Sequence, residues 1–182
     1  SDIVVGAPYY ANGQSNEGRT FVYLGSASGP VSPATWTAES NQVGANFGYS
    51  VSSAGDVNGD GYSDIIVAAP YYANSQTGEG RAYVYYGSAA GPAAAAAWTA
   101  ESDLSTAQFG TSVSSAGDVN GDGYSDVIVG AYRLTNGQTN EGKAYVYLGS
   151  ASGLALTAAW TAESDQASAY FGNSVSSAGD VN

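Results

Sequence analysis

The feature that most constrains this chain is an internal repeat of 62 residues that no insertion interrupts. The three tryptophans keep this spacing, at Trp36, Trp98 and Trp160. Three Phe-Gly pairs keep it too, at Phe47-Gly48, Phe109-Gly110 and Phe171-Gly172. Between the two full units, which begin at residues 47 and 109, roughly two thirds of the positions are identical. A period of this length is typical of supersecondary units that stack so that each one covers the next.

Each unit contains four short segments with the character of β-strands. In the first full unit these are an alternating segment, a continuous apolar run, an aromatic and β-branched segment and a Trp-Thr segment, at residues 47–54, 64–69, 81–86 and 97–101. Segments rich in Gly, Asn, Asp and Ser separate them, as in turns. Residues 93–97 have the composition of a helix, but Pro33 in the aligned segment of the preceding unit favours a loop.

Four antiparallel strands in each unit predict the blades of a β-propeller. The stretch from Ile65 to Ala69 is apolar at every position, which suits a strand that neighbouring blades cover on both faces. A β-solenoid would repeat at a much shorter period. We therefore predict an all-β fold of four-stranded antiparallel blades, with three blade equivalents in the chain.

Three motifs give this unit a specific likeness. The pair Phe47-Gly48, the acidic segment from Gly55 to Gly61 and the pair Ala69-Pro70 together resemble the FG-GAP repeat of integrin α chains and of many bacterial surface proteins. Gly6-Ala7-Pro8 matches the second half of the motif, whereas the third copy replaces this proline with Tyr132. The resemblance covers essentially the whole chain. It implies a propeller that binds calcium, and we expect such a protein outside the cell or on its surface.

The acidic segment has the ligand spacing of a calcium loop. Oxygen-bearing side chains stand at loop positions 1, 3, 5 and 9, and position 7 offers a backbone carbonyl, as in the first part of an EF-hand loop. In the first full unit the candidate ligands are Asp56, Asn58, Asp60, Tyr62 and Asp64. In the second they are Asp118, Asn120, Asp122, Tyr124 and Asp126. Position 12 is Val67 instead of the EF-hand glutamate, so we expect no helix-loop-helix switch. The resemblance places the loop between the first two strands of a blade.

Other interpretations of the loop are weaker. Asp, Asn and Gly also favour turns that hold no ion, but such a turn would bring three carboxylates together without a nearby cation. Magnesium requires stricter geometry, and transition metals favour His or Cys, which the chain lacks. We therefore predict calcium as the bound ion. Gly61 and Gly123 should adopt backbone angles that a Cβ disfavours.

Composition excludes several functions. Sixteen acidic residues against four basic ones give a formal charge of −12, which disfavours nucleic acid and anionic lipid. No apolar run approaches the roughly 20 residues of a membrane helix, so we expect no membrane insertion. The absence of His and Cys excludes the usual nucleophilic triads within this chain, and no asymmetric set of catalytic groups is visible. We expect a protein that is not an enzyme.

Two binding functions remain. The first is a calcium-stabilised scaffold for adhesion or protein interaction, and the second is a lectin-like propeller that binds carbohydrate. The 15 tyrosines and three tryptophans would suit sugar stacking, but the alternating pairs in the strands favour packing between blades. The variable loops at residues 71–77 and 132–135 are the expected ligand-facing segments. Their partner is a protein or a glycan.

The two ends of the chain look complementary. Counting blades from the Phe-Gly pair, residues 2–46 supply strands two to four of one blade, residues 47–108 and 109–170 form whole blades, and residues 171–182 begin another with its first strand, 171–179. An unpaired edge promotes association, so we expect a head-to-tail homo-oligomer, most simply a dimer with six blades. A longer array in one polypeptide is the alternative. Asp180, Asn182 and Asp2 could form a split third calcium site, absent or weak because the segment that supplies position 5 is missing.

Overall fold

The computed structural model describes residues 1–182 and contains thirteen β-strands and no helix. The first part of the chain forms β1 Ile3–Ala7, β2 Arg19–Tyr23, β3 Gly25–Ser26, β4 Gly29–Pro30 and β5 Trp36–Glu39. The central part forms β6 Ser50–Gly55, β7 Asp64–Ala69, β8 Arg81–Tyr85 and β9 Trp98–Glu101. The last part forms β10 Ser112–Gly117, β11 Asp126–Ala131, β12 Lys143–Tyr147 and β13 Trp160–Glu163. The strands lie on the predicted segments with small differences at their ends: β6 begins three residues after Phe47 and ends one residue later than predicted, β8 ends before Tyr86, and β9 begins one residue after Ala97.

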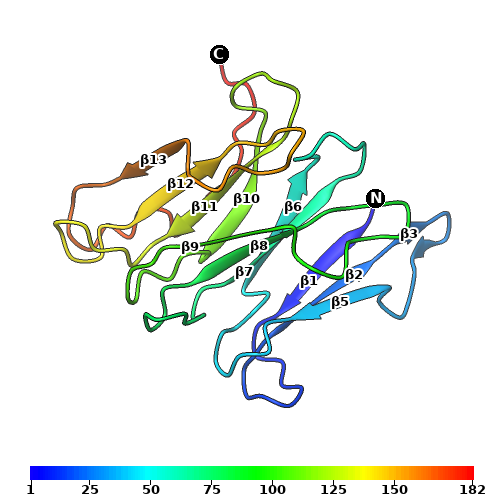
Figure 1. Ribbon diagram of the computed structural model, residues 1–182, viewed down its shortest axis with the longest axis horizontal. Helices are drawn as coiled ribbons and strands as arrows, with labels where there is room; N and C mark the ends of the chain where they lie inside the picture. The colour runs from blue at the N-terminus through cyan, green and yellow to red at the C-terminus, as the bar shows by residue number, and fades with distance from the viewer.

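The strands form three sheets in sequence. The first sheet has the order β1-β2-β5, the second sheet β6-β7-β8-β9 and the third sheet β10-β11-β12-β13, while β3 and β4 form a separate short hairpin. All neighbouring strands within these sheets are antiparallel. Figure 1 shows the three sheets side by side, with β1, β6 and β10 next to one another. The predicted all-β class, with four-stranded blades, is confirmed.

Aromatic side chains fill the spaces between the sheets. Trp36 of the first sheet meets Tyr85 of the second edge-to-face, with 5.0 Å between ring centroids, and Trp98 meets Tyr147 in the same way at 4.9 Å. The indole nitrogen of Trp98 also donates a hydrogen bond of 2.9 Å to the carbonyl of Ala155 in the third unit. Packing between sheets is therefore the role of these aromatic residues, as their alternation predicted.

The Phe-Gly pair lies where one unit meets the next. Phe47 is fully buried, and its N–H donates a hydrogen bond of 3.0 Å to the carbonyl of Glu17 in the preceding unit. Gly18, with a φ of 79°, lies directly against the backbone of Phe47, and any Cβ at this position would clash with it. The junction recurs at Phe109 and Phe171. The motif thus joins successive sheets through close backbone contact.

The two ends of this row of sheets are open. The first sheet has no strand outside β1, and Ile3 and Val5 are 45% and 44% exposed. Their counterparts in the third sheet, Val127 and Val129, are fully buried. At the other end, Phe171 pairs with Gly142 in an isolated bridge, and residues 173–182 belong to no sheet. The segment expected as a first strand therefore has no ladder partner in this chain.

Candidate metal-binding loops and exposed surfaces

Two acidic loops connect the first and second strands of the two complete sheets. The loop of residues 56–63 joins β6 to β7, and the loop of residues 118–125 joins β10 to β11. Each follows an irregularity in strand register, between Ser53 and Gly55 in the second sheet and between Ser115 and Gly117 in the third. Such a bulge turns the chain sharply at the end of a strand, and here it lies directly before the first aspartate of each loop.

The first loop folds around the carboxylate of Asp56. This carboxylate accepts hydrogen bonds from the backbone N–H groups of Gly59 at 2.7 Å, Asp60 at 3.1 Å and Gly61 at 2.8 Å. Three converging donors require a tight turn, and Gly61 has a φ of 89°. Gly123 has a φ of 92° at the equivalent position. The expected backbone angles of both glycines are confirmed.

The middle of the loop holds Asn58 and Asp60 against one another. The Asn58 amide donates a hydrogen bond of 3.0 Å to Asp60 Oδ2, and Asp60 Oδ1 accepts one of 2.9 Å from the N–H of Tyr62. These bonds satisfy the acidic side chains with neutral donors inside the loop. Backbone and amide N–H groups therefore offset part of the repulsion that the sequence predicts for an ion-free turn, and none of the ion pairs of the chain lies in this loop.

The last aspartate of the loop is buried at the start of β7. Asp64 is 0% exposed, and its two carboxylate oxygens accept backbone hydrogen bonds from Val57 at 2.9 Å and Gly87 at 2.8 Å. Burial raises its pKa, the two hydrogen bonds lower it in part, and the charges of Asp60 and Asp56 raise it further. Asp64 thus connects the loop to the end of β8, and its pKa depends in part on the charges of both other acids.

The second loop repeats this arrangement almost atom for atom. The N–H groups of Gly121, Asp122 and Gly123 donate to Asp118 at 2.7, 3.0 and 2.8 Å. The Asn120 amide donates to Asp122 at 2.8 Å, and Asp122 accepts from the N–H of Tyr124 at 3.0 Å. Asp126, also buried, accepts from Val119 and Gly149 at 2.8 Å each, and its pKa is raised mainly by burial.

The donor set fits a hard cation. Every side-chain ligand candidate in the two loops offers oxygen, which calcium prefers, and the loops contain no His or Cys. The carboxylates nevertheless do not converge, since no group of three or more acidic, His or Cys side chains is placed to hold one metal ion. In each loop the oxygens face N–H donors. Calcium binding would require these side chains to turn toward a common point.

The three residues of the split site lie at opposite ends of the chain. Asp2 accepts a hydrogen bond of 2.7 Å from the N–H of Gly25, as Asp64 does from Gly87. Asp180 accepts one of 3.2 Å from the N–H of Asn182. Figure 1 shows the two chain ends well apart. One copy of the chain therefore does not bring Asp2 together with Asp180 and Asn182.

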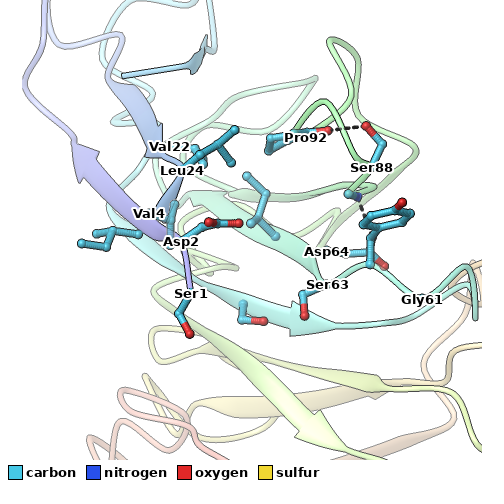
Figure 2. A pocket seen from close by; sticks show the side chains of 16 residues that line it. Ser1, Asp2, Val4, Val22, Leu24, Gly61, Ser63, Asp64, Ser88 and Pro92 are labelled. Carbon is cyan, nitrogen blue, oxygen red and sulfur yellow. Dashed lines mark hydrogen bonds between the residues drawn. The ribbon is translucent and has the colours of Figure 1, made fainter. Parts of the chain in front are cut away.

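A cavity of about 440 Å³ lies between the first and second sheets, beside the first acidic loop. Figure 2 shows Asp2, Val4 and Leu24 on one side of it and Ser63, Asp64 and Ser88 on the other. The repeat alone did not predict this cavity. The cavity could have been expected from the first unit, which lacks the first strand of a blade, because a missing strand leaves the space that it would fill.

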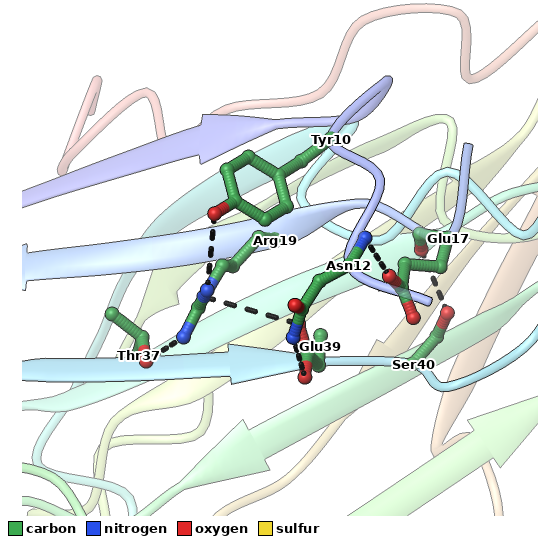
Figure 3. Close-up of polar contacts among 7 residues, drawn as sticks. All are labelled: Tyr10, Asn12, Glu17, Arg19, Thr37, Glu39 and Ser40. Atoms are coloured by element: carbon green, nitrogen blue, oxygen red, sulfur yellow. Dashed lines mark hydrogen bonds and ion pairs between the residues drawn. The ribbon is translucent and has the colours of Figure 1, made fainter. Parts of the chain in front are cut away.

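A polar network that the sequence analysis missed closes the loop before β2. Glu17 is 0% exposed, and its carboxylate accepts the N–H of Asn12 while its carbonyl accepts the Ser40 hydroxyl at 2.7 Å (Figure 3). The Asn12 amide donates to Glu39 at 3.1 Å, and Arg19 pairs with Glu39 at 3.9 Å. Glu79 and Glu141 are equally buried. Their spacing of 62 residues was the available signal.

A cluster at the variable loops, which we call the tyrosine surface, contains Tyr71, Tyr132 and Arg133 of these loops together with Tyr49 and Tyr170. Tyr49 and Tyr71 meet edge-to-face at 6.3 Å, and Arg133 lies 5.7 Å from the ring centroid of Tyr132. Partial burial raises the pKa of Tyr71, and neighbouring Tyr132 adds to the effect. The other three cations pair with glutamates, whereas Arg133 forms no ion pair.

These features define a class: a repeat protein of β-propeller blades with an acidic loop in each complete blade. Residues 47–85 and 109–147 match the family model described as FG-GAP repeat, so the chain contains two FG-GAP repeats. Curated relatives include integrin alpha-IIb of Mus musculus, 34% identical over 72% of this chain, and integrin alpha-4 of Xenopus laevis, 32% identical over 72%. Integrin alpha-PS2 of Drosophila melanogaster is 38% identical over 62%.

The likeness concerns a small part of these relatives. The chain spans 13% of the length of the first two and 8% of the third. The structure contains no helix that is long and apolar enough to cross a membrane.

Proposed function

We propose that this chain is a calcium-stabilised propeller scaffold for adhesion or protein interaction, working outside the cell or at its surface. The observation that carries the proposal is the pair of matching all-oxygen loops, each tied into its sheet by a buried aspartate, in a chain with FG-GAP repeats. The integrin alpha relatives support the cell-surface setting. We propose no catalytic role.

Calcium would be held by Asp56, Asn58, Asp60, Asp64 and the Tyr62 carbonyl, and by the equivalent residues of the second loop. The ion would supply positive charge beside Asp64, whose pKa is raised mainly by burial and further by the charges of Asp60 and Asp56. Because Asp64 also accepts the N–H of Gly87, a stiffened loop would hold the end of β8 in place. The role is structural.

Calorimetric titration of the chain with calcium tests this proposal. We expect two ions per chain, and one ion for Asp118→Asn, because the first loop remains intact. Asp103→Asn is the matched control: it removes the same charge from an exposed residue outside the loops, so both ions should remain. Retention of two ions by Asp118→Asn, or binding of none by the original chain, would refute the proposed sites.

We also propose that copies of the chain join head to tail by strand exchange, most simply as a six-bladed dimer. The open edge of β1 and the unpaired segment after Phe171 support this arrangement. It would bring Asp180 and Asn182 of one copy near Asp2 of the next. That third calcium site would be absent or weak, because the residue at position 5 is missing. Native mass spectrometry should detect the dimer, and monomer alone at all concentrations would exclude it.

Carbohydrate binding is the second candidate, and the tyrosine surface favours it. Exposed tyrosine rings can stack on sugars, and the unpaired Arg133 could meet an acidic sugar. Glycan-array binding that Tyr71→Ser abolishes would support this function. Array binding that persists in that variant would place any sugar elsewhere, and an array without signal would leave protein interaction as the function of this surface.

A further inference from the structure

The cavity between the first and second sheets has a filled counterpart within the same molecule. Between the second and third sheets, the equivalent space contains Ala54 at the end of β6 and Val57 in the first acidic loop, both 0% exposed. The first sheet lacks a strand equivalent to β6. The cavity is therefore the place that an Ala-Gly-Asp-Val segment takes in a complete blade.

The filled counterpart also shows which backbone groups hold this segment. The carbonyl of Asp56 accepts a hydrogen bond of 2.9 Å from the N–H of Ser125, and the carbonyl of Val57 accepts one of 3.1 Å from Ser150. The equivalents of Ser125 and Ser150, 62 residues earlier, are Ser63 and Ser88. Both line the cavity, and their N–H groups have no acceptor. The cavity thus offers two backbone donors at the positions where the segment is bonded elsewhere.

One segment of the chain matches the missing occupant. Residues 178–181 read Ala-Gly-Asp-Val, as residues 54–57 do, and Val181 is 81% exposed. Ahead of it, residues 174–177 repeat the Ser-Val-Ser-Ser of β6, which pairs with β7 from Ser50 opposite Ala68 to Ser53 opposite Ile65. By the same register, residues 174–177 would cover Ile3 to Gly6 on the open edge of β1.

The chain cannot place this segment on its own first sheet in the arrangement seen here. Residues 171–177 lie beside β10, where Gly172 accepts a hydrogen bond from Ser112 and Ser177 approaches Gly117. The first and third sheets are at opposite ends of the row (Figure 1). A second copy can supply the segment without unfolding anything, because its end is already exposed.

We propose that the cavity is a peptide-binding site for the C-terminal segment of a second copy, with Val181 buried in the cavity and residues 174–177 paired along β1. This inference rests on the proposed head-to-tail assembly and names the site at which it occurs. The carbonyls of Asp180 and Val181 would accept the free N–H groups of Ser63 and Ser88. Leu24 and Gly91 both line the cavity, and the Leu24 side chain approaches Gly91. Leu24 would therefore form part of the wall around the bound Val181.

A labelled peptide of residues 171–182 tests the site. The receptor is the full chain carrying Val181→Asp, which blocks its own donor end while leaving the cavity intact. We expect saturable binding of the peptide, weakened at least about tenfold when the peptide itself carries Val181→Asp, because a buried valine is replaced by a charge. Adding Leu24→Asp to the receptor should weaken binding, whereas adding Leu156→Asp, in an 84% exposed loop position, should not.

The outcomes separate this inference from the proposed function. Calcium titration of the same receptor reports the two loops, which the substitutions do not touch. Absence of peptide binding by a receptor that still binds two calcium ions would overturn the site and leave the calcium scaffold standing. Equal binding of the two peptides would also overturn it, since β1 would then pair with strands without using the cavity.

Discussion

At the scale of single residues, the two acidic loops depend on backbone angles that most side chains avoid. Gly61 and Gly123 have φ values near 90°, and a Cβ on either one would meet no atom within 4 Å. The reason for glycine is therefore backbone conformation and not lack of space. Ala or Val in this region is strained by about 1–3 kcal/mol, while Asn tolerates it better.

Gly61→Val should weaken calcium binding at the first loop by roughly tenfold, because about 1.4 kcal/mol of strain corresponds to a factor of ten in the dissociation constant. The second loop should be unchanged. Gly61→Asn should have a smaller effect. Calorimetry with the unmodified second loop as internal control measures both. Equal weakening of the two loops would mean that the substitution disturbs the whole fold.

Buried tyrosines set an alkaline limit on stability. Burial raises the pKa of Tyr85 to about 12, and burial with the nearby charge of Glu163 raises that of Tyr145 to about 12. A raised pKa means that the folded state holds the phenol proton more tightly than the unfolded chain. This stabilisation is complete below pH about 10 and is lost as pH rises toward 12. Circular dichroism should detect unfolding in that window, together with tyrosinate absorbance; full ionisation without unfolding would contradict the burial.

At the scale of elements, the tryptophans connect each sheet to the next. Trp98 packs on Tyr147 and bonds to Ala155, whereas Trp160 occupies the same position in the third sheet and is 51% exposed, with no sheet beyond it. The same position of the repeat is thus buried between two sheets at Trp98 and exposed at Trp160.

Trp98→Phe should lower the free energy of unfolding by about 1–3 kcal/mol, through loss of a buried hydrogen bond and of ring contact. Trp160→Phe is the matched control and, at concentrations low enough for single copies of the chain, should change it by less than about 0.5 kcal/mol. Urea denaturation measures both. Similar losses in the two variants would show that Trp160 is covered in solution, as closure of a ring by another copy would require.

The elements themselves could be predicted because the repeat displays each one two or three times. The apolar run at Ile65–Ala69 and the turn residues around it sufficed to place β7. The sequence did not reveal the buried Glu17, because a charged residue in a loop ordinarily faces solvent. Nor did spacing alone show where the loop oxygens point. Asp56 and Asp60 accept hydrogen bonds from backbone N–H groups here, and this orientation depends on the backbone geometry of the loop.

At the scale of the whole molecule, the proposed assembly assigns the chain one donor end and one acceptor end. The boundary between the second and third sheets is filled, whereas the cavity between the first and second sheets, the edge of β1 and the segment after Phe171 are open. Contacts between unlike ends must either close into a ring or continue as a filament. In the proposed function, calcium would act within a sheet and a second copy at the ends of this row of sheets.

The melting temperature with and without calcium tests the central claim, that calcium bound to the folded loops stabilises the propeller. At 100 times the dissociation constant, each bound ion adds about 2.7 kcal/mol, so two ions should add roughly 5 kcal/mol. For a chain of this length, we expect excess chelator to lower the melting temperature by about 10–20 °C. The drop should be about half as large in Asp118→Asn. An unchanged melting temperature in excess chelator would contradict the account.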